Sequence, residues 1–304
     1  MIYSVIHNTD LKVSVICLGT WVFGGSSWGG SKENDCIGAI ACALDHGINF
    51  IDTAPIYGWG KSEAIVGKAI KGNRDRFVIA TKCGFIHRFG QAVRSLSPAS
   101  IKNEIEESLK HLQTDCIDLY QCHWPDEKTP IEKTMQMLDQ LEKEGKIRYI
   151  GVSNFEPDLV KRACQAVEVV TSQNGYSMLD RSIEKDLLPL LRERSMGLLA
   201  YGPLAGGILT GKYTAPPMFL PNDARKFFYK YYDGDAFKQA QALLNTLKRI
   251  GKPLNQVAIN WVRQQPGVVS VIVGCRNAQQ VKDNAPAADW SLSEQQLKEI
   301  NEKN

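Results

Sequence analysis

The sequence predicts a closed (β/α)₈ barrel, and three observations lead to this fold class. Eight short apolar runs recur along the chain, and longer amphipathic segments alternate with them. Each run is apolar along its whole length, as expected of parallel strands that are covered on both faces. The chain has 304 residues and no Pro-, Gly- or Ser-rich linker, which suits one barrel, since single barrels commonly contain about 250 residues or more. We therefore expect one domain over residues 1–304.

The barrel strands are expected where the apolar runs fall. In chain order these are Val13–Gly19, Asn49–Ala54, Phe77–Cys83, Cys116–His123, Ile147–Asn154, Val169–Asn174, Gly197–Gly202 and Ser270–Gly274. Helical patterns lie between them, at Asn34–His46, Pro98–Leu112, Ile131–Glu144, Pro157–Ala166 and Ile183–Arg194. Ser97 before Pro98 is typical of a helix start, and Gly145 of a helix end. An open doubly wound sheet is the alternative, but no Gly-x-Gly-x-x-Gly motif follows the first strand.

Three segments lie outside the repeat. Met1–Leu11 is expected to form a small hairpin that closes the amino-terminal end of the barrel. Pro203–Phe237 contains eight aromatic residues and four prolines, and loops of this length are usually lids or binding loops for substrate and cofactor. Ser291–Ile300 has the pattern of a final helix, which we expect to pack outside the barrel.

Charge and cysteine usage exclude several classes of protein. The chain has 36 Lys and Arg against 33 Asp and Glu, a net charge of +3, which predicts neither a nucleic-acid partner nor a membrane-surface partner. No apolar run approaches the ~20 residues of a membrane-spanning helix, and the amino terminus lacks a secretory-signal pattern. Eight scattered cysteines without a Cys-x-x-Cys pair predict no metal site, no disulfide framework and a cytoplasmic location.

Four ionisable residues lie at or just after the ends of three consecutive predicted strands. Asp52 lies at the end of the second strand and Tyr57 follows it, Lys82 lies near the end of the third, and His123 ends the fourth. In barrels of this class the chemistry occurs at the carboxyl ends of the strands, so the four side chains are expected at one rim. Each has an ordinary structural explanation when taken alone, such as a turn cap or a packed loop aromatic. Their coincidence at matching strand ends indicates a catalytic site.

The four residue types form a coherent acid–base set. Lys82 and Asp52 would pair, because either charge alone is costly at a partly buried rim. The ammonium beside the phenol is expected to lower the pKa of Tyr57, so that it exchanges a proton near neutral pH. His123 would donate a second hydrogen bond to the same carbonyl or alcohol oxygen of the substrate. No side chain supplies hydride, so the set requires a cofactor.

The later strand ends offer groups that suit such a cofactor. Ser153, Asn154 and Gln173 can hydrogen-bond a carboxamide, and Tyr201 can stack on a nicotinamide ring. Arg276 lies where a helix begins after the eighth strand, which suits a phosphate. Five aromatic residues are expected just beyond strand ends, as a substrate wall for aldehydes, ketones or sugar faces: Trp21, Phe23, Trp28, Trp59 and Trp124.

Six sequence motifs together are highly specific for one protein family. They are Gly47–Gly58, Thr81–Lys82, Gln121–Asp126, Gly145–Phe155, Gln173–Tyr176 and Tyr201–Gly207. Through them the chain resembles the aldo-keto reductases over nearly its whole length. The motif sequences are most similar to those of the bacterial branch typified by general stress protein 69, and the potassium-channel β subunits are more distant.

The resemblance implies a barrel that binds NADP(H) in extended form and reduces carbonyls. It implies Tyr57 as general acid, Lys82 and Asp52 as its tuning pair, and His123 as the residue that orients the carbonyl. The implied cofactor-binding residues are Ser153, Asn154, Gln173, Tyr201, Gly202, Pro203, Leu204, Gly206, Gly274, Arg276, Gln280 and Asn284. Vertebrate members carry a Lys-Ser pair and a later Arg in the last motif, where this chain has Gly274-Cys275 and Gln280. Arg276 is then the natural partner of a 2′-phosphate.

Three functions follow from these observations. The first is an NADPH-dependent oxidoreductase that reduces aldehydes or ketones, including sugar-like carbonyls, as small-molecule substrates. The second is an NADP(H)-binding regulatory or redox-sensing subunit with little turnover. The third is an aldolase that forms a Schiff base at Lys82. The sequence names neither the physiological substrate nor the oligomeric state.

Overall fold

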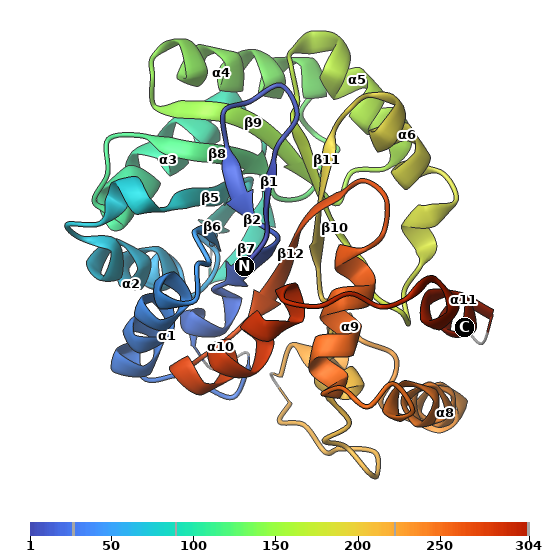
Figure 1. Cartoon of the computed structure of the whole chain (residues 1–304). Coiled ribbons are helices and arrows are strands. Elements are labelled where there is room, and N and C mark those ends of the chain that lie inside the picture. The colour runs from blue at the N-terminus through green and yellow to red at the C-terminus, as the bar shows by residue number, and fades with distance from the viewer. Residues whose placement is uncertain (26–27, 89, 222, 303–304) are drawn as a thin grey trace.

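The computed structural model describes residues 1–25, 28–88, 90–221 and 223–302 and contains a closed barrel of parallel strands. The strands, in barrel order, are β3 (Ile16–Gly19), β4 (Phe50–Asp52), β5 (Val78–Cys83), β8 (Ile117–Cys122), β9 (Ile147–Ser153), β10 (Thr171–Gly175), β11 (Gly197–Tyr201) and β12 (Val268–Gly274). β12 pairs with β3 and closes the ring. Figure 1 shows the helices arranged around the outside of these strands. The predicted fold class is therefore confirmed.

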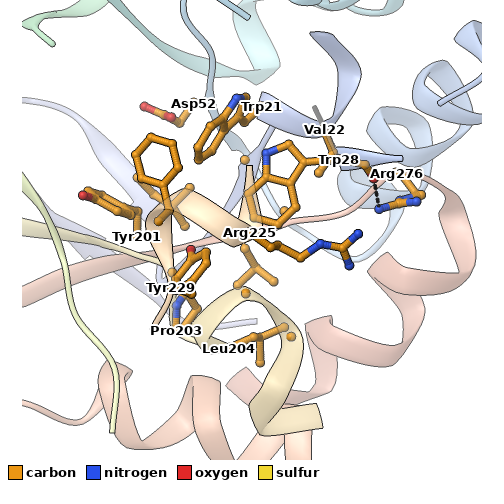
Figure 2. Close-up of a pocket in the computed structure, with 18 of the residues that line it drawn as sticks. Trp21, Val22, Trp28, Asp52, Tyr201, Pro203, Leu204, Arg225, Tyr229 and Arg276 are labelled. Carbon is orange, nitrogen blue, oxygen red and sulfur yellow. Dashed lines mark hydrogen bonds between the residues drawn. The ribbon is translucent and has the colours of Figure 1, made fainter. Parts of the chain in front are cut away.

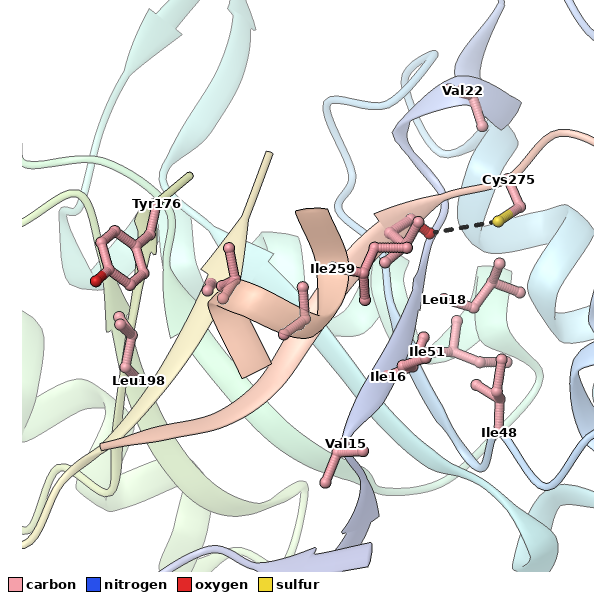
Figure 3. Close-up of a cluster of buried hydrophobic side chains, with 14 of the residues drawn as sticks. Val15, Ile16, Leu18, Val22, Ile48, Ile51, Tyr176, Leu198, Ile259 and Cys275 are labelled. Atoms are coloured by element: carbon pink, nitrogen blue, oxygen red, sulfur yellow. Dashed lines mark hydrogen bonds between the residues drawn. The ribbon is translucent and has the colours of Figure 1, made fainter. Parts of the chain in front are cut away.

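The strands are buried on both faces, which explains their continuous apolar sequences. On β3, Ile16 and Leu18 point outward to the helices, whereas Cys17 points into the barrel. Figure 3 shows part of the outer layer, where Ile16, Leu18 and Ile51 of the strands gather with Ile48. A smaller cluster fills the barrel interior, and it includes Phe50 and Leu119.

The helices that cover the barrel are α1 (Glu33–Asp45), α2 (Lys61–Ile70), α3 (Pro98–Leu112), α4 (Ile131–Lys143), α5 (Pro157–Ala166), α6 (Leu187–Glu193), α8 (Gly234–Lys248), α9 (Leu254–Arg263) and α10 (Ala278–Asn284). Each of the five helical segments predicted between the strands overlaps one of them, whereas α2, α8 and α9 were not predicted. The Ser97 hydroxyl caps α3 by accepting from the Ser100 amide. The helix predicted over Ile183–Arg194 is instead a 3₁₀ turn at Ser182–Glu184 followed by α6, so its first turn is corrected.

An amino-terminal hairpin closes one end of the barrel, as predicted. It consists of β1 (Tyr3–Val5) and β2 (Lys12–Ser14), and it lies across the barrel end that faces the viewer in Figure 1. Ile6, Leu11 and Val13 pack into the interior cluster, and this burial holds the hairpin in place. The predicted first strand began at Val13, but the structure assigns Val13 to the hairpin and starts the barrel strand at Ile16.

The remaining segments surround the opposite end of the barrel or pack at its side. A second hairpin, β6 (Phe85–Arg88) with β7 (Gln91–Arg94), follows β5 and was not predicted. The long segment after β11 contains a 3₁₀ helix at Ala205–Thr210 and the short helix α7 (Arg225–Phe228), and it ends where α8 begins at Gly234 rather than at Phe237. The predicted last helix is present as α11 (Glu294–Glu302). None of the helices in the described part of the chain is long and apolar enough to cross a membrane.

Candidate active site

A cavity of about 810 Å³ opens at the carboxyl ends of the barrel strands. Its wall extends from Phe85 and His123 to Arg276 and Asn284. Figure 2 shows Trp21, Trp28 and Tyr201 pointing into the cavity together with residues of the long segment after β11. The wall includes three of the four predicted catalytic residues (Asp52, Tyr57 and His123) and every predicted cofactor residue: Ser153, Asn154, Gln173, Tyr201, Gly202, Pro203, Leu204, Gly206, Gly274, Arg276, Gln280 and Asn284.

The fourth catalytic residue, Lys82, lies fully buried directly behind the wall. Its ammonium donates to Asp52 Oδ2 at 2.7 Å, to the Thr53 carbonyl at 2.8 Å and to the Tyr57 hydroxyl at 3.3 Å. All three ammonium protons therefore have acceptors, which a buried charge requires. Asp52 ends β4 and Lys82 lies on the neighbouring strand β5, so strand pairing itself brings the two charges together.

A loop after β4 carries Tyr57 to the rim. Gly58 has φ of +72°, and a Cβ atom there would lie 2.1 Å from the Gly24 carbonyl oxygen, so the two glycine backbones are in direct contact. This close approach brings the turn at Trp21–Gly24 against the Tyr57 loop. The Trp21 and Tyr57 rings stack with their centroids 5.8 Å apart and 19° between their planes. The Tyr57 ring therefore has an aromatic neighbour on the cavity side and an ammonium behind it.

The directions of the pKa shifts indicate which side chains at the catalytic rim carry a proton at neutral pH. Burial, and then the negative charge of Asp52, raise the pKa of Tyr57 well above its usual value. The expectation that Lys82 lowers this pKa is wrong for the free protein, because Asp52 counters the ammonium and the phenol is desolvated. Burial, and then the charges of Lys82 and Arg94, lower the pKa of His123 well below its usual value. At neutral pH the site therefore contains a protonated phenol and a neutral imidazole.

Two glutamines hold the other oxygen of Asp52. Gln173 Nε2 donates to Asp52 Oδ1 at 2.7 Å, and Gln121 Nε2 does so at 3.4 Å. The two glutamines also contact each other, since Gln173 Nε2 lies 3.3 Å from Gln121 Oε1. A Cβ atom on Gly151 would lie 2.9 Å from Gln121 Cγ, so this glycine makes room for the Gln121 side chain. Gln121 was missed by the sequence reasoning, although its position before Cys122-His123 at a strand end was a signal.

The residues predicted to hold a carboxamide form a connected network. Asn154 Nδ2 donates to the His123 carbonyl at 3.0 Å, and Asn154 Oδ1 accepts from the Tyr201 hydroxyl at 2.9 Å. The Ser153 hydroxyl donates to the Gln173 carbonyl at 2.8 Å. The network fixes the Tyr201 ring in the cavity wall, and burial raises the pKa of Tyr201 to about 12, so the ring is a neutral phenol.

The far end of the cavity combines glycine backbone with a cation. Gly202 and Gly206 have φ of +71° and +68°, and a Cβ atom on Gly206 would lie 2.3 Å from the Tyr232 hydroxyl, so a side chain has no room there. Arg276 donates from Nη2 to the Trp28 carbonyl at 2.8 Å, a contact that Figure 2 shows as a dashed line. Its backbone amide donates to Gln280 Oε1 at 2.9 Å, which places both residues at the start of α10.

The predicted substrate wall is only partly assembled. Trp21, Trp28 and Trp124 line the cavity. Phe23 does not, because the turn at Trp21–Gly24 directs it into the core, where it has no exposed surface. Trp59 is 45% exposed and packs against His87 of the β6–β7 hairpin, outside the cavity wall. The assignments of Phe23 and Trp59 to the substrate pocket are therefore corrected.

Several wall residues were missed by the sequence reasoning. Phe85 from the β6–β7 hairpin meets His123 edge-on, with the ring centroids 5.2 Å apart. Phe228 of α7 meets Trp21 edge-on at 5.0 Å, and Tyr229 lines the cavity beside it. The density of aromatic residues in Pro203–Phe237 was the available signal for Phe228 and Tyr229. Their individual orientations depend on how that segment folds back over the barrel.

The wall fits an extended nicotinamide dinucleotide. It offers an aromatic face at Tyr201, a backbone cradle at Gly202 and Gly206, and a guanidinium at Arg276. Within the described ranges, no hydrogen bond reaches Gln173 Oε1, which leaves an acceptor for a carboxamide N–H at the wall. In the part of the chain that the structure describes, no group of three His, Cys, Asp or Glu side chains is arranged to hold a metal ion.

Fold and site together describe a (β/α)₈ oxidoreductase. The family model described as "Aldo/keto reductase family" matches residues 15–304, and the chain belongs to this family, whose members use nicotinamide cofactors. The chain is 40% identical to aldo-keto reductase YhdN of Bacillus subtilis (99% of this chain, 93% of the relative) and 37% identical to the NADH-specific methylglyoxal reductase of Escherichia coli (94% and 93%). The narrower resemblance to the general stress protein 69 branch stays a prediction.

A solved structure agrees with this family membership. The glycerol dehydrogenase AKR11B4 from Gluconobacter oxydans superposes with a TM-score of 0.91 at 35% identity, and the match covers 99% of this chain and 94% of that one. The match extends over nearly the whole chain.

Proposed function

We propose that the protein reduces aldehydes and ketones to alcohols with NADPH. One observation carries this proposal: the Tyr57 hydroxyl stands in the cavity wall, 3.3 Å from a buried ammonium and beside a neutral imidazole. A protonated phenol at that place is a proton donor to a carbonyl oxygen. The phenolate left after donation is stabilised by the adjacent Lys82 ammonium, which lowers the barrier to the transfer.

His123 acts on the same oxygen. Its ring meets the Tyr57 ring edge-on, with the centroids 5.8 Å apart, so the two side chains are neighbours in the cavity wall. A neutral imidazole donates one N–H, and a hydrogen bond to the carbonyl oxygen strengthens as negative charge develops there. Tyr57 supplies the proton and His123 orients the acceptor.

The cofactor would lie along the wall between these residues and α10. A bound reduced nicotinamide supplies the hydride that no side chain can provide. Gln173, Ser153 and Asn154 would hold its carboxamide, Tyr201 would contact the ring, and the glycine backbone after β11 would follow the pyrophosphate. Arg276 favours NADPH over NADH, because a guanidinium attracts the additional 2′-phosphate. The NADH-specific relative makes this preference a point for direct measurement.

The substrate end of the wall favours small uncharged carbonyl compounds. Trp21, Trp124, Phe85 and Phe228 surround Tyr57 and His123, and aromatic rings of this kind suit apolar or sugar-like faces. The names of the relatives agree with small oxygenated substrates, since one reduces methylglyoxal and another is a glycerol dehydrogenase.

The two other functions have less support. A Schiff-base aldolase needs a neutral lysine that reaches the substrate, whereas Lys82 is fully buried, paired with Asp52 and behind the wall. A regulatory subunit needs the cofactor site alone, and a complete acid–base set beside it favours turnover. We also propose a reducing, cytoplasmic setting, because all eight cysteines are free thiols and six of them are buried.

The test is turnover with a matched variant. NADPH and NADH oxidation are followed with a panel of aldehydes, ketones and α-dicarbonyls, first for the wild type and then for Tyr57→Phe. We expect Tyr57→Phe to lower kcat by about 10²- to 10⁴-fold, the usual contribution of general acid catalysis, with cofactor affinity by fluorescence within about twofold of the wild type. Wild-type binding of NADPH without turnover on any carbonyl would favour the regulatory function. Substantial activity in Tyr57→Phe would show that Tyr57 is not the general acid.

A further inference from the structure

The first turn of α2 lies directly behind the loop that carries Tyr57, and it contains two fully buried polar residues, Ser62 and Glu63. The Ser62 hydroxyl lies 2.8 Å from Thr20 Oγ1 and 3.0 Å from Thr53 Oγ1. Thr20 follows β3 and Thr53 follows β4, so Ser62 connects two neighbouring strand ends at the catalytic rim.

Glu63 connects the third strand end. Glu63 Oε1 accepts from the Thr81 hydroxyl at 2.7 Å, and Thr81 precedes Lys82 on β5. Glu63 Oε2 faces His111 Nδ1 of α3 at 3.5 Å. A carboxylate with no exposed surface requires such partners, since burying it alone would be costly. The nearby Glu63 carboxylate raises the pKa of His111, which favours the charged pair.

The His111 imidazole in turn supports the backbone of the Tyr57 loop. A Cβ atom on Gly60 would lie 2.3 Å from His111 Cε1, so the imidazole packs directly against this glycine. Gly60 has φ of +87°, and its amide donates to the Pro55 carbonyl at 2.7 Å, which closes the loop that contains Tyr57. The Ser62 amide also donates to the Tyr57 carbonyl, at 3.1 Å.

The separation of 3.3 Å between the Tyr57 hydroxyl and the Lys82 ammonium depends on two independent backbone segments. One is the loop over residues 55–60, and the other is β5. Glu63 contacts the second segment through Thr81 and supports the first through His111. We propose that Glu63 is a positioning residue for the reaction, and that it sets the distance between Tyr57 and Lys82 through Thr81 and His111. The proposal rests on the proposed function of Tyr57 as the acid.

Two substitutions at Thr81 separate positioning from general stability. Thr81→Val removes the hydroxyl that Glu63 accepts from and leaves a buried carboxylate oxygen without its donor. Thr81→Ser keeps the hydroxyl and removes a methyl group. Because misplacement of reacting groups by about 1 Å costs up to about a hundredfold in rate, we expect Thr81→Val to lower kcat by about tenfold or more, with KM and cofactor affinity nearly unchanged. Thr81→Ser is expected to restore kcat to within about threefold of the wild type.

A second variant and a control protect the interpretation. His111→Ala removes the support under Gly60 at a half-buried position, and we expect it to lower kcat by a similar factor. This variant provides the test in case Thr81→Val does not fold. Ser270→Ala removes a buried hydroxyl-to-carbonyl hydrogen bond of 2.8 Å to Ser14, at the opposite end of the barrel. It is expected to lower Tm without lowering kcat, as a purely structural hydrogen bond would.

Crystal structures of Thr81→Val and Thr81→Ser measure the separation between Tyr57 and Lys82 without any turnover. A longer separation in the valine variant alone, together with its lower kcat, is the expected result. An unchanged separation, or a loss of Tm with normal kcat, would overturn the proposal. A wild type that binds NADPH but reduces no carbonyl would refute the proposed function, whereas the crystallographic separation would still decide whether Glu63 positions the two side chains.

Discussion

At the scale of single residues, the pair formed by Asp52 and Lys82 is the most consequential interaction of the site. Both side chains are almost fully buried, and the pair spans 2.7 Å. A buried ion pair adds little net stability, but the removal of one partner leaves an uncompensated charge in a medium of low dielectric constant. The Lys82 ammonium also stabilises the phenolate that Tyr57 forms during catalysis. The stability of the fold and the activity of Tyr57 therefore both depend on the ion pair between Asp52 and Lys82.

The substitution Asp52→Asn is expected to reduce both properties together. It leaves the Lys82 ammonium without its counter-charge, so we expect a loss of about 3 to 5 kcal/mol in the free energy of unfolding, measured by urea denaturation, and a large fall in kcat. Asp10→Asn is the matched control, because Asp10 forms an ion pair with Arg148 while its side chain is 68% exposed. That exposed pair should cost about 1 kcal/mol or less. Equal losses in the two variants would contradict the buried-charge argument.

Residue identity could be predicted better than residue orientation. Asp52, Lys82 and His123 are predictable because strand pairing brings the strand ends together at one rim, and Tyr57 follows Asp52 by only five positions. Trp21 and Phe23 are two positions apart in one short turn, yet one faces the cavity and the other the core. The direction of the pKa shift of Tyr57 depended on desolvation, which a sequence does not display.

At the scale of secondary-structure elements, the β6–β7 hairpin shows why some parts could not be predicted. Its strands have only four residues each, and all of these residues are exposed or half-buried, so they lack the continuous apolar pattern of the barrel strands. A single side chain from α3 anchors the base of the hairpin. Glu104 Oε2 accepts from the amides of Gly84 and Phe85 at 3.0 and 3.2 Å. Because Phe85 contacts His123, this anchor also supports the substrate wall.

The anchor predicts a pH dependence of stability. Burial raises the pKa of Glu104 from about 4.5 to about 7, so the folded state holds a proton that the unfolded state has already released in this interval. The stabilisation from that proton is full below about pH 4.5 and is lost as the pH rises through 7. The loss amounts to about 3 kcal/mol, since each pKa unit corresponds to about 1.4 kcal/mol.

Glu104→Gln removes this titration and keeps the acceptor for the two amides. We expect the free energy of unfolding of the variant, relative to the wild type, to rise by about 3 kcal/mol between pH 4.5 and 8. Urea denaturation at several pH values measures the difference. Glu106→Gln on the same helix is the control, because Glu106 pairs with Lys146 near the surface. A pH-independent difference between Glu104→Gln and the wild type would mean that the pKa of Glu104 lies in its ordinary range.

At the scale of the whole molecule, the cavity is assembled from nearly every part of the chain. Its wall takes residues from the turn after β3, the ends of β4, β8, β9, β10 and β11, the long segment and the start of α10. The barrel itself could be predicted from its eight buried strands. The arrangement of the segments that surround the cavity could not be predicted. It depends on contacts such as that between Arg276 and Trp28, which are 248 positions apart in sequence. A ligand that occupies this cavity should therefore stabilise the complete fold.

Binding of the cofactor is expected to raise Tm in a way that reports its identity. NADPH at about one hundred times its Kd adds about 2.7 kcal/mol to the free energy of unfolding, which corresponds to roughly 4 °C in a chain of this length. Because Arg276 provides the cation for the 2′-phosphate, NADH at the same concentration should give a smaller shift, and Arg276→Met should make the two shifts equal. Lys282→Met changes an exposed residue of α10, the helix that follows Arg276, and should leave the difference intact. Equal shifts by NADH and NADPH in the wild type would mean that Arg276 does not select the phosphate, and the preference for NADPH would be withdrawn while the cavity remained a nicotinamide site.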